Sequence, residues 1–100
     1  MKIDALLINS KDNVATALRD IDANESVTVG ENKKKKSISV KEKIPFGHKF
    51  ATKTIKKDGN IYKYGEIIGK ATKSIPEGYY AHIHNIESLR GRGDLERKLK

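Results

Sequence analysis

The sequence predicts a small, mainly β protein with one short helix near its N-terminus. Two features lead to this fold class. Short runs rich in β-branched residues recur along the chain, and Gly or Pro residues separate them at close intervals. A unit of about twenty residues is also repeated in the second half, which is typical of a pseudo-symmetric sheet.

The N-terminal part is predicted to contain a strand followed by the helix. Residues 2–8 (KIDALLI) are typical of a strand. In residues 12–21 the apolar side chains follow the i, i+3, i+4, i+7 spacing of an amphipathic helix. Asp12 at the start of this segment favours a helix because a carboxylate is stabilised near the helix N-terminus.

A hairpin with a basic tip is predicted next. Residues 26–29 (SVTV) and 37–40 (SISV) alternate apolar and polar side chains, and residues 30–36 form a polar turn between them. This turn contains four consecutive lysines, Lys33 to Lys36. No aromatic residue is interleaved with them to stack on bases, so we expect a solvated turn and no nucleic-acid partner.

The second half contains the repeated unit. Residues 51–55 (ATKTI) recur as residues 71–75 (ATKSI), and each copy leads into a strand that carries aromatic residues, at 61–64 and 79–83. The last residues, 91–100, are charged and interrupted by glycine, so we expect a mobile tail.

Composition limits the classes of function. The 100 residues suit one domain, 1–100, with one modest core. The absence of Cys excludes disulfides and thiolate metal sites. No apolar run is long enough to span a membrane and no secretory signal is visible, so a cytoplasmic protein without a membrane partner is expected. The net charge of +8 favours anionic partners, although most lysines can simply be solvated.

Two histidines near the C-terminal end form the candidate site. On the predicted strand, His82 and His84 would point to one face, roughly 6.5–7 Å apart at Cα, while Ile83 would point to the core. Two imidazoles on one face can bind a divalent metal or a carboxylate. The plainer alternative is a polar pair on the surface.

Further polar residues surround this pair in the sequence. Asn85 extends it, and Arg90 and Arg92 carry guanidinium groups suited to gripping a carboxylate. His48 follows a turn at residues 45–47 (PFG). The plainer alternatives are a structural role for His48 in that turn and a flexible Arg-rich tail.

Taken together, these blocks resemble the SAF-type domain of the altronate and galactarate dehydratase family. The resemblance covers nearly the whole chain in order and is carried by residues 12–18 (DNVATAL), 44–51 (IPFGHKFA), 63–69 (KYGEIIG), 75–78 (IPEG), 81–85 (AHIHN) and 87–94 (ESLRGRGD). The family also includes the small subunit of sulfolactate sulfo-lyase. Residues 79–81 (YYA) and the basic hairpin tip depart from the usual family pattern.

The resemblance implies a β-clip fold and a role beside a larger catalytic subunit. The chain would be the small subunit of a sugar-acid dehydratase, a hydro-lyase of the altronate dehydratase type, and would be inactive alone. Homo-oligomerisation and the identity of the sugar acid stay open. The alternatives are a small subunit of a sulfolactate sulfo-lyase, a non-catalytic module that binds carbohydrates or anions, and a basic nucleic-acid binder.

Dehydration of a sugar acid removes a proton α to the carboxylate and expels the β-hydroxyl. This reaction needs a base, an acid and stabilisation of an enolate-like intermediate. His48, His82 and His84 are the candidate catalytic residues, and Asn85, Arg90 and Arg92 are the candidate substrate-binding residues. His82 and His84 are also candidate ligands for a divalent metal such as iron or manganese.

Overall fold

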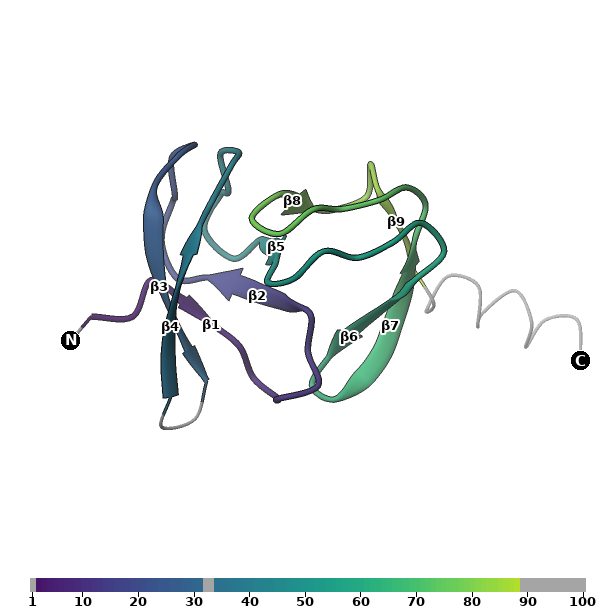
Figure 1. The fold of residues 1–100 in the computed structure, drawn as a ribbon, viewed down its shortest axis with the longest axis horizontal. Helices are drawn as coiled ribbons and strands as arrows, with labels where there is room; N and C mark the ends of the chain where they lie inside the picture. Colours follow the sequence, from purple (N-terminus) through teal and green to yellow (C-terminus); the bar gives the residue numbers. More distant parts are fainter. Residues whose placement is uncertain (1, 32–33, 89–100) are drawn as a thin grey trace, which may run out of the picture.

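The computed structural model describes residues 2–31 and 34–88 (Figure 1), and within them it contains nine strands and no helix. The strands are β1 (Ala5–Leu6), β2 (Val14–Ala17), β3 (Ser26–Glu31), β4 (Lys34–Ser39), β5 (Lys49–Ala51), β6 (Asn60–Lys63), β7 (Glu66–Ala71), β8 (Tyr80–Ala81) and β9 (Ile86–Ser88). The prediction of a mainly β fold is confirmed.

The strands form two sheets that lie side by side in Figure 1. The larger sheet has the order β4-β3-β1-β2-β5-β8, and the smaller has the order β6-β7-β9. Only β1 and β3 pair in parallel; the other pairs within the described residues are antiparallel. Strands β5 and β8 therefore form one edge of the larger sheet, and the β3–β4 hairpin forms the other.

Two hydrophobic cores lie on opposite sides of the central strands. Successive residues of a strand point to opposite faces, so β2 contributes Ala15 to the first core and Val14 to the second. Strand β5 likewise contributes Phe50 to the first core and Ala51 to the second. All four side chains are buried, which means that these strands have no solvent-facing side at these positions.

This double burial explains why the helix predicted over residues 12–21 is wrong. The segment contains strand β2, a bend and a β-bridge at Ile21. A strand buried on both faces has no apolar–polar alternation, so its periodicity resembles that of a short helix. Val14 and Thr16 are β-branched and favour the extended conformation.

Asp12 does not cap a helix but joins the two sheets. Its buried carboxylate accepts hydrogen bonds from the backbone amides of Asn9 (3.0 Å), Tyr64 (3.0 Å) and Gly65 (2.8 Å). The amide side chain of the adjacent Asn13 bonds twice to the backbone of β6, at 2.9 Å each. The link between β1 and β2 is thereby fixed to the β6–β7 hairpin.

One element of the repeated unit, a bridged isoleucine followed by a tight turn, occurs four times in the described residues, whereas the sequence predicted two copies of the unit. Each copy has a buried isoleucine in a β-bridge, and the bridges pair Ile21 with Ile44 and Ile55 with Ile75. Three residues after each isoleucine the backbone φ is positive: 70° at Asn24, 83° at Gly47, 70° at Asp58 and 87° at Gly78. The two N-terminal turns were not predicted as part of the repeat, because they share the backbone geometry of the other two but lack the Ala-Thr-Lys sequence.

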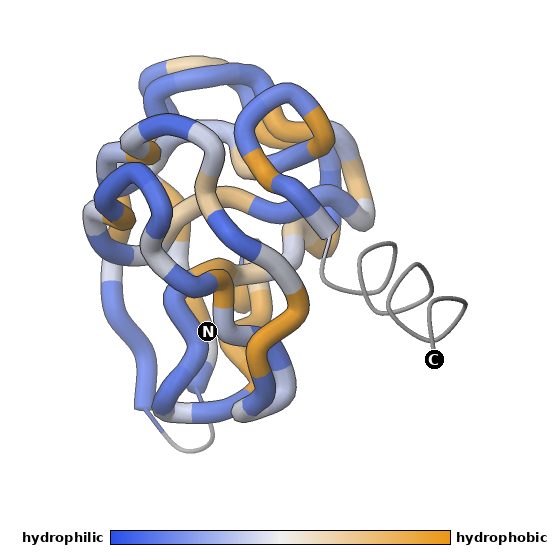
Figure 2. Tube along the Cα trace, turned by 90° about the vertical axis from the view of Figure 1, so that its right-hand side faces the viewer, coloured by the Kyte–Doolittle hydropathy of each residue, from blue (hydrophilic) through white to orange (hydrophobic). Residues whose placement is uncertain are grey.

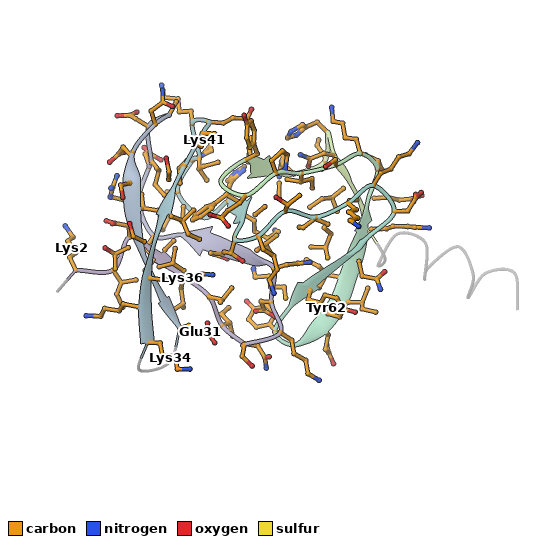
Figure 3. All side chains as sticks on the ribbon, in the orientation of Figure 1. Lys2, Glu31, Lys34, Lys36, Lys41 and Tyr62 are labelled. Atoms are coloured by element: carbon orange, nitrogen blue, oxygen red, sulfur yellow. The ribbon has the colours of Figure 1, made fainter. Side chains whose placement is uncertain are left out.

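The predicted hairpin is confirmed, but the lysines are placed differently from expectation. Strands β3 and β4 pair from Ser26↔Ser39 to Glu31↔Lys34. Lys34 and Lys36 therefore lie in the exposed edge strand β4 rather than in the turn (Figure 3). The chain on both sides of this turn is hydrophilic (Figure 2). Lys33 and the predicted tail at 91–100 lie outside the described residues.

Candidate functional site

Three turn and strand segments bring a cluster of aromatic side chains together at the β5–β8 edge. We call His48, Tyr80, His82 and His84 the histidine–tyrosine cluster. Tyr80 is at its centre: its ring is stacked on that of His82, with centroids 5.3 Å apart and planes 6° apart, and lies 5.4 Å from that of His84. The ring centroids of His48 and His82 are 4.7 Å apart.

His48 is placed by a tight turn before β5. Gly47 adopts a φ of 83°, a conformation that glycine accepts without strain. The amide of His48 then donates to the carbonyl of Pro45 at 3.0 Å. The imidazole Nδ1 of His48 lies 2.5 Å from the hydroxyl oxygen of Tyr80, within hydrogen-bond distance.

The expected strand geometry around His82 and His84 is wrong. Strand β8 ends at Ala81, and residues 82–85 form a turn in which the amide of Asn85 donates to the carbonyl of His82. Ile83 does not point to the core, because 83% of it is exposed. The two histidines still share a neighbour, since the turn brings both rings to Tyr80.

Asn85 braces this turn from inside. Its side chain is buried, its Nδ2 donates to the carbonyl of Tyr80 at 2.7 Å, and its Oδ1 accepts from the amide of His82 at 2.9 Å. The amide is thus bonded to the backbone on either side of Ala81. In this arrangement Asn85 positions Tyr80 and His82.

A lysine that is not among the residues predicted from sequence lies beside the cluster. Lys49 is half-buried at the start of β5 and lines a hollow of about 160 Å³ together with His82, Ile68, Ile83, Ile86 and Ser88. Its position directly after His48 in the motif IPFGHKFA was the available signal. That signal was weak because the chain has so many solvated lysines.

The surroundings of His82 and Lys49 disfavour the protonated form of both side chains. Burial lowers the pKa of His82, and the positive charges of His48, Lys49 and His84 lower it further. Burial also lowers the pKa of Lys49, with a contribution from Lys63. Both shifts follow from cations held close together and away from water.

The structure does not test the other two predicted site residues. Arg90 and Arg92 lie outside the described residues. Within residues 2–31 and 34–88, no group of three or more His, Cys, Asp or Glu side chains could hold a metal ion. In the same part of the chain, no helix is long and apolar enough to cross a membrane.

The cluster can therefore move protons and attract anions. It combines three imidazole rings, a phenol hydroxyl within hydrogen-bond distance of one of them, and an adjacent lysine. His48 and His82 are partly exposed and His84 is exposed, so a substrate or a partner surface can reach them.

Comparison with known proteins gives a consistent family. A model of the altronate/galactarate dehydratase SAF domain matches residues 3–89. Altronate dehydratase from Bacillus subtilis (strain 168) is 41% identical over 81 residues, which are 81% of this chain and 16% of that enzyme. The (2R)-sulfolactate sulfo-lyase subunit alpha from Chromohalobacter salexigens is 30% identical over 93 residues, which cover 90% of this chain and 99% of that subunit.

The chain spans only a small part of the dehydratases it matches, 16% of the Bacillus subtilis enzyme and 15% of altronate dehydratase from Escherichia coli (strain K12). The match to the family model nevertheless covers every strand of the described residues. This chain belongs to the family of SAF domains of altronate and galactarate dehydratases.

Proposed function

We propose that this chain acts in the cytoplasm as the small component of a sugar-acid hydro-lyase and completes an active site on a larger catalytic subunit. The observation that carries the proposal is the histidine–tyrosine cluster, in which acid–base side chains meet at a partly exposed edge. A cluster on so open a surface lacks the walls that exclude water from a catalytic site, so the chain alone should be inactive.

The relatives indicate the class of substrate. By their names they act on altronate, galactarate and (2R)-sulfolactate. All three compounds are 2-hydroxy carboxylates with a leaving group on the β carbon. A single proton-transfer site next to a carboxylate-binding group can serve this whole class.

In the proposed reaction, His82 and the His48–Tyr80 pair have different roles. The neutral imidazole of His82 takes the proton from the α carbon, and the C–H electron pair forms the double bond to the β carbon. The β-hydroxyl leaves as water with a proton supplied through the His48–Tyr80 hydrogen bond. The resulting enol then tautomerises to a 2-keto-3-deoxy acid.

A second candidate function is that of a sulfolactate sulfo-lyase subunit. It is supported by the 30% identity to the sulfo-lyase subunit alpha over 93 residues. The proton transfer from the α carbon would be the same, but sulfite would leave from the β carbon in place of water. The measured product therefore separates the two candidates.

A divalent metal such as iron or manganese is part of the proposal only if this chain and the large subunit share its ligands. His82 and His84 could offer two imidazoles, but no third His, Cys, Asp or Glu of the described residues is arranged with them to hold a metal ion. The large subunit would have to supply the rest. For that reason no step above runs through a metal.

Co-expression with a large catalytic dehydratase subunit that lacks its own SAF domain tests the proposal. The purified pair is assayed with altronate, galactarate and (2R)-sulfolactate, and 2-keto-3-deoxy acid or sulfite is measured. We expect product only when both chains are present. Failure of the chains to form a complex, or a large subunit that is equally active alone, would point instead to a non-catalytic binding module.

A further inference from the structure

The hollow beside the histidine–tyrosine cluster has an unusual lining. It lies between the two sheets, with Lys49 on β5 of the larger sheet and Ile68, Ile86 and Ser88 on β7 and β9 of the smaller. His82 and the exposed Ile83 complete it. Its walls are thus largely apolar, and its charged or titratable groups are a lysine and a histidine.

Lys49 has no acidic partner in this setting. Within residues 2–31 and 34–88, no carboxylate forms a salt bridge with it, and the charge that affects its pKa most is the positive charge of Lys63. A half-buried ammonium without a counter-ion is unfavourable because it loses hydration without gaining an opposite charge. An anion entering the hollow would relieve this cost.

The backbone fixes Lys49 and His82 next to each other. In the antiparallel β5–β8 pair, Lys49 lies opposite Ala81, and His82 is the next residue after Ala81. Asn85 holds the backbone of His82 through its side-chain amide. The lysine and the imidazole are therefore positioned by the sheet and by a partly buried hydrogen bond.

We propose that this hollow is an anion subsite in which Lys49 binds the carboxylate of a 2-hydroxy acid. The inference rests on the proposed function and deepens it, because a carboxylate on Lys49 places the adjoining α carbon beside His82. The partly apolar walls strengthen the attraction, since a lower dielectric screens it less than water does. The ammonium has three N–H donors and can bind one carboxylate while remaining partly hydrated.

Ligand titration of the full chain by NMR tests the subsite without any partner. The probe is lactate, the simplest chiral 2-hydroxy carboxylate, and lactamide is its uncharged analogue. At fixed pH, the Cε resonance of Lys49 and the ring resonances of His82 are followed as each compound is added. We expect saturable shifts with lactate and none with lactamide.

Two substitutions with the same loss of charge then locate the binding. Lys49→Met should weaken lactate binding about tenfold or more, as expected for losing a charged hydrogen bond. Lys2→Met should change it less than about twofold, because Lys2 lies at the far end of the molecule from the smaller sheet (Figure 3). Equal binding by Lys49→Met and the unchanged chain, or equal shifts with lactamide, would overturn the subsite.

The assembled enzyme separates failure of this inference from failure of the proposed function. If the subsite is right, Lys49→Met raises KM for the sugar acid about tenfold or more, and Lys49→Arg restores part of the loss. If only the inference is wrong, Lys49→Met keeps normal kinetics while His82→Ala loses turnover. If only the proposed function is wrong, no partner gives turnover, yet lactate still shifts Lys49 and His82.

Discussion

Nδ1 of His48 lies 2.5 Å from the hydroxyl oxygen of Tyr80, and this contact joins the turn before β5 to strand β8. Residues that are 32 positions apart in the chain thereby form one hydrogen-bonded pair. The ring of the same tyrosine is stacked on His82, so its hydroxyl and its ring serve different neighbours.

Replacing Tyr80 with Phe should separate those two contributions. The ring and its stacking on His82 remain, while the hydrogen bond to His48 is lost. We expect a small change in melting temperature and a loss of about 10²-fold in turnover of the assembled enzyme, typical of losing an acid–base group. Calorimetry and steady-state kinetics on the same preparation check this. Undiminished turnover would remove Tyr80 from the reaction.

Asp12 should be the most sensitive polar residue for folding. In Asp12→Asn, the new NH₂ group would face backbone amides that are themselves donors, so at least one buried hydrogen bond is lost. We expect a decrease of about 2–4 kcal/mol in the free energy of unfolding. Asp22→Asn is a matched control, since Asp22 is exposed and should change stability by less than about 0.5 kcal/mol. Similar urea midpoints for the two variants would contradict this role of Asp12.

The stability of the chain should fall on mild acidification because of His82. Its pKa is below the ordinary value of 6.5 in the folded chain, so between the two values the unfolded chain binds more protons. The free energy of unfolding must then decrease as pH falls through this window. Melting curves at pH 7.5 and 5.5 should show this decrease, and His82→Gln should reduce it. The lowered pKa values of Asp4 and Glu25 act at lower pH, because their ordinary values are 3.8 and 4.5.

The lysines of β4 should matter for association more than for folding. Strand β4 is a sheet edge, and edge lysines hinder pairing with another chain. Replacing Lys34 and Lys36 with Ser should alter stability by less than about 0.5 kcal/mol each. Size-exclusion chromatography at rising concentration should show more self-association than for the unchanged chain. A strictly monomeric variant would leave these lysines as solvated surface only.

The mainly β fold could be predicted from local sequence patterns. The parts of that prediction that were wrong also have local causes. The hairpin at 26–40 was predicted because each strand has one buried and one exposed face. Strand β2 was mistaken for a helix because both of its faces are buried in different cores. The turn at Asn24 was not predicted, because a positive φ at a residue other than glycine has no clear signal in the sequence.

The site could be predicted in part. His48, His82 and His84 were selected from sequence, and the structure brings their rings to Tyr80; their catalytic roles stay predictions. The strand predicted to bring His82 and His84 together was wrong, since a turn places these two residues. Lys49 was not selected, because its position after His48 is only a weak signal and its significance comes from burial and from the absence of an acidic partner within the described residues.

The central claim is that the histidine–tyrosine cluster serves an assembled enzyme and not the fold of this chain. Its most direct test is a paired measurement on His82→Ala and His84→Ala: thermal melts of the chain alone, and turnover of a sugar acid after mixing with the large subunit. The account predicts small changes in melting temperature, because both side chains are at least partly exposed. It also predicts a loss of about 10²-fold or more in turnover for His82→Ala. Full turnover with both histidines removed, or a collapse in melting temperature, would contradict it.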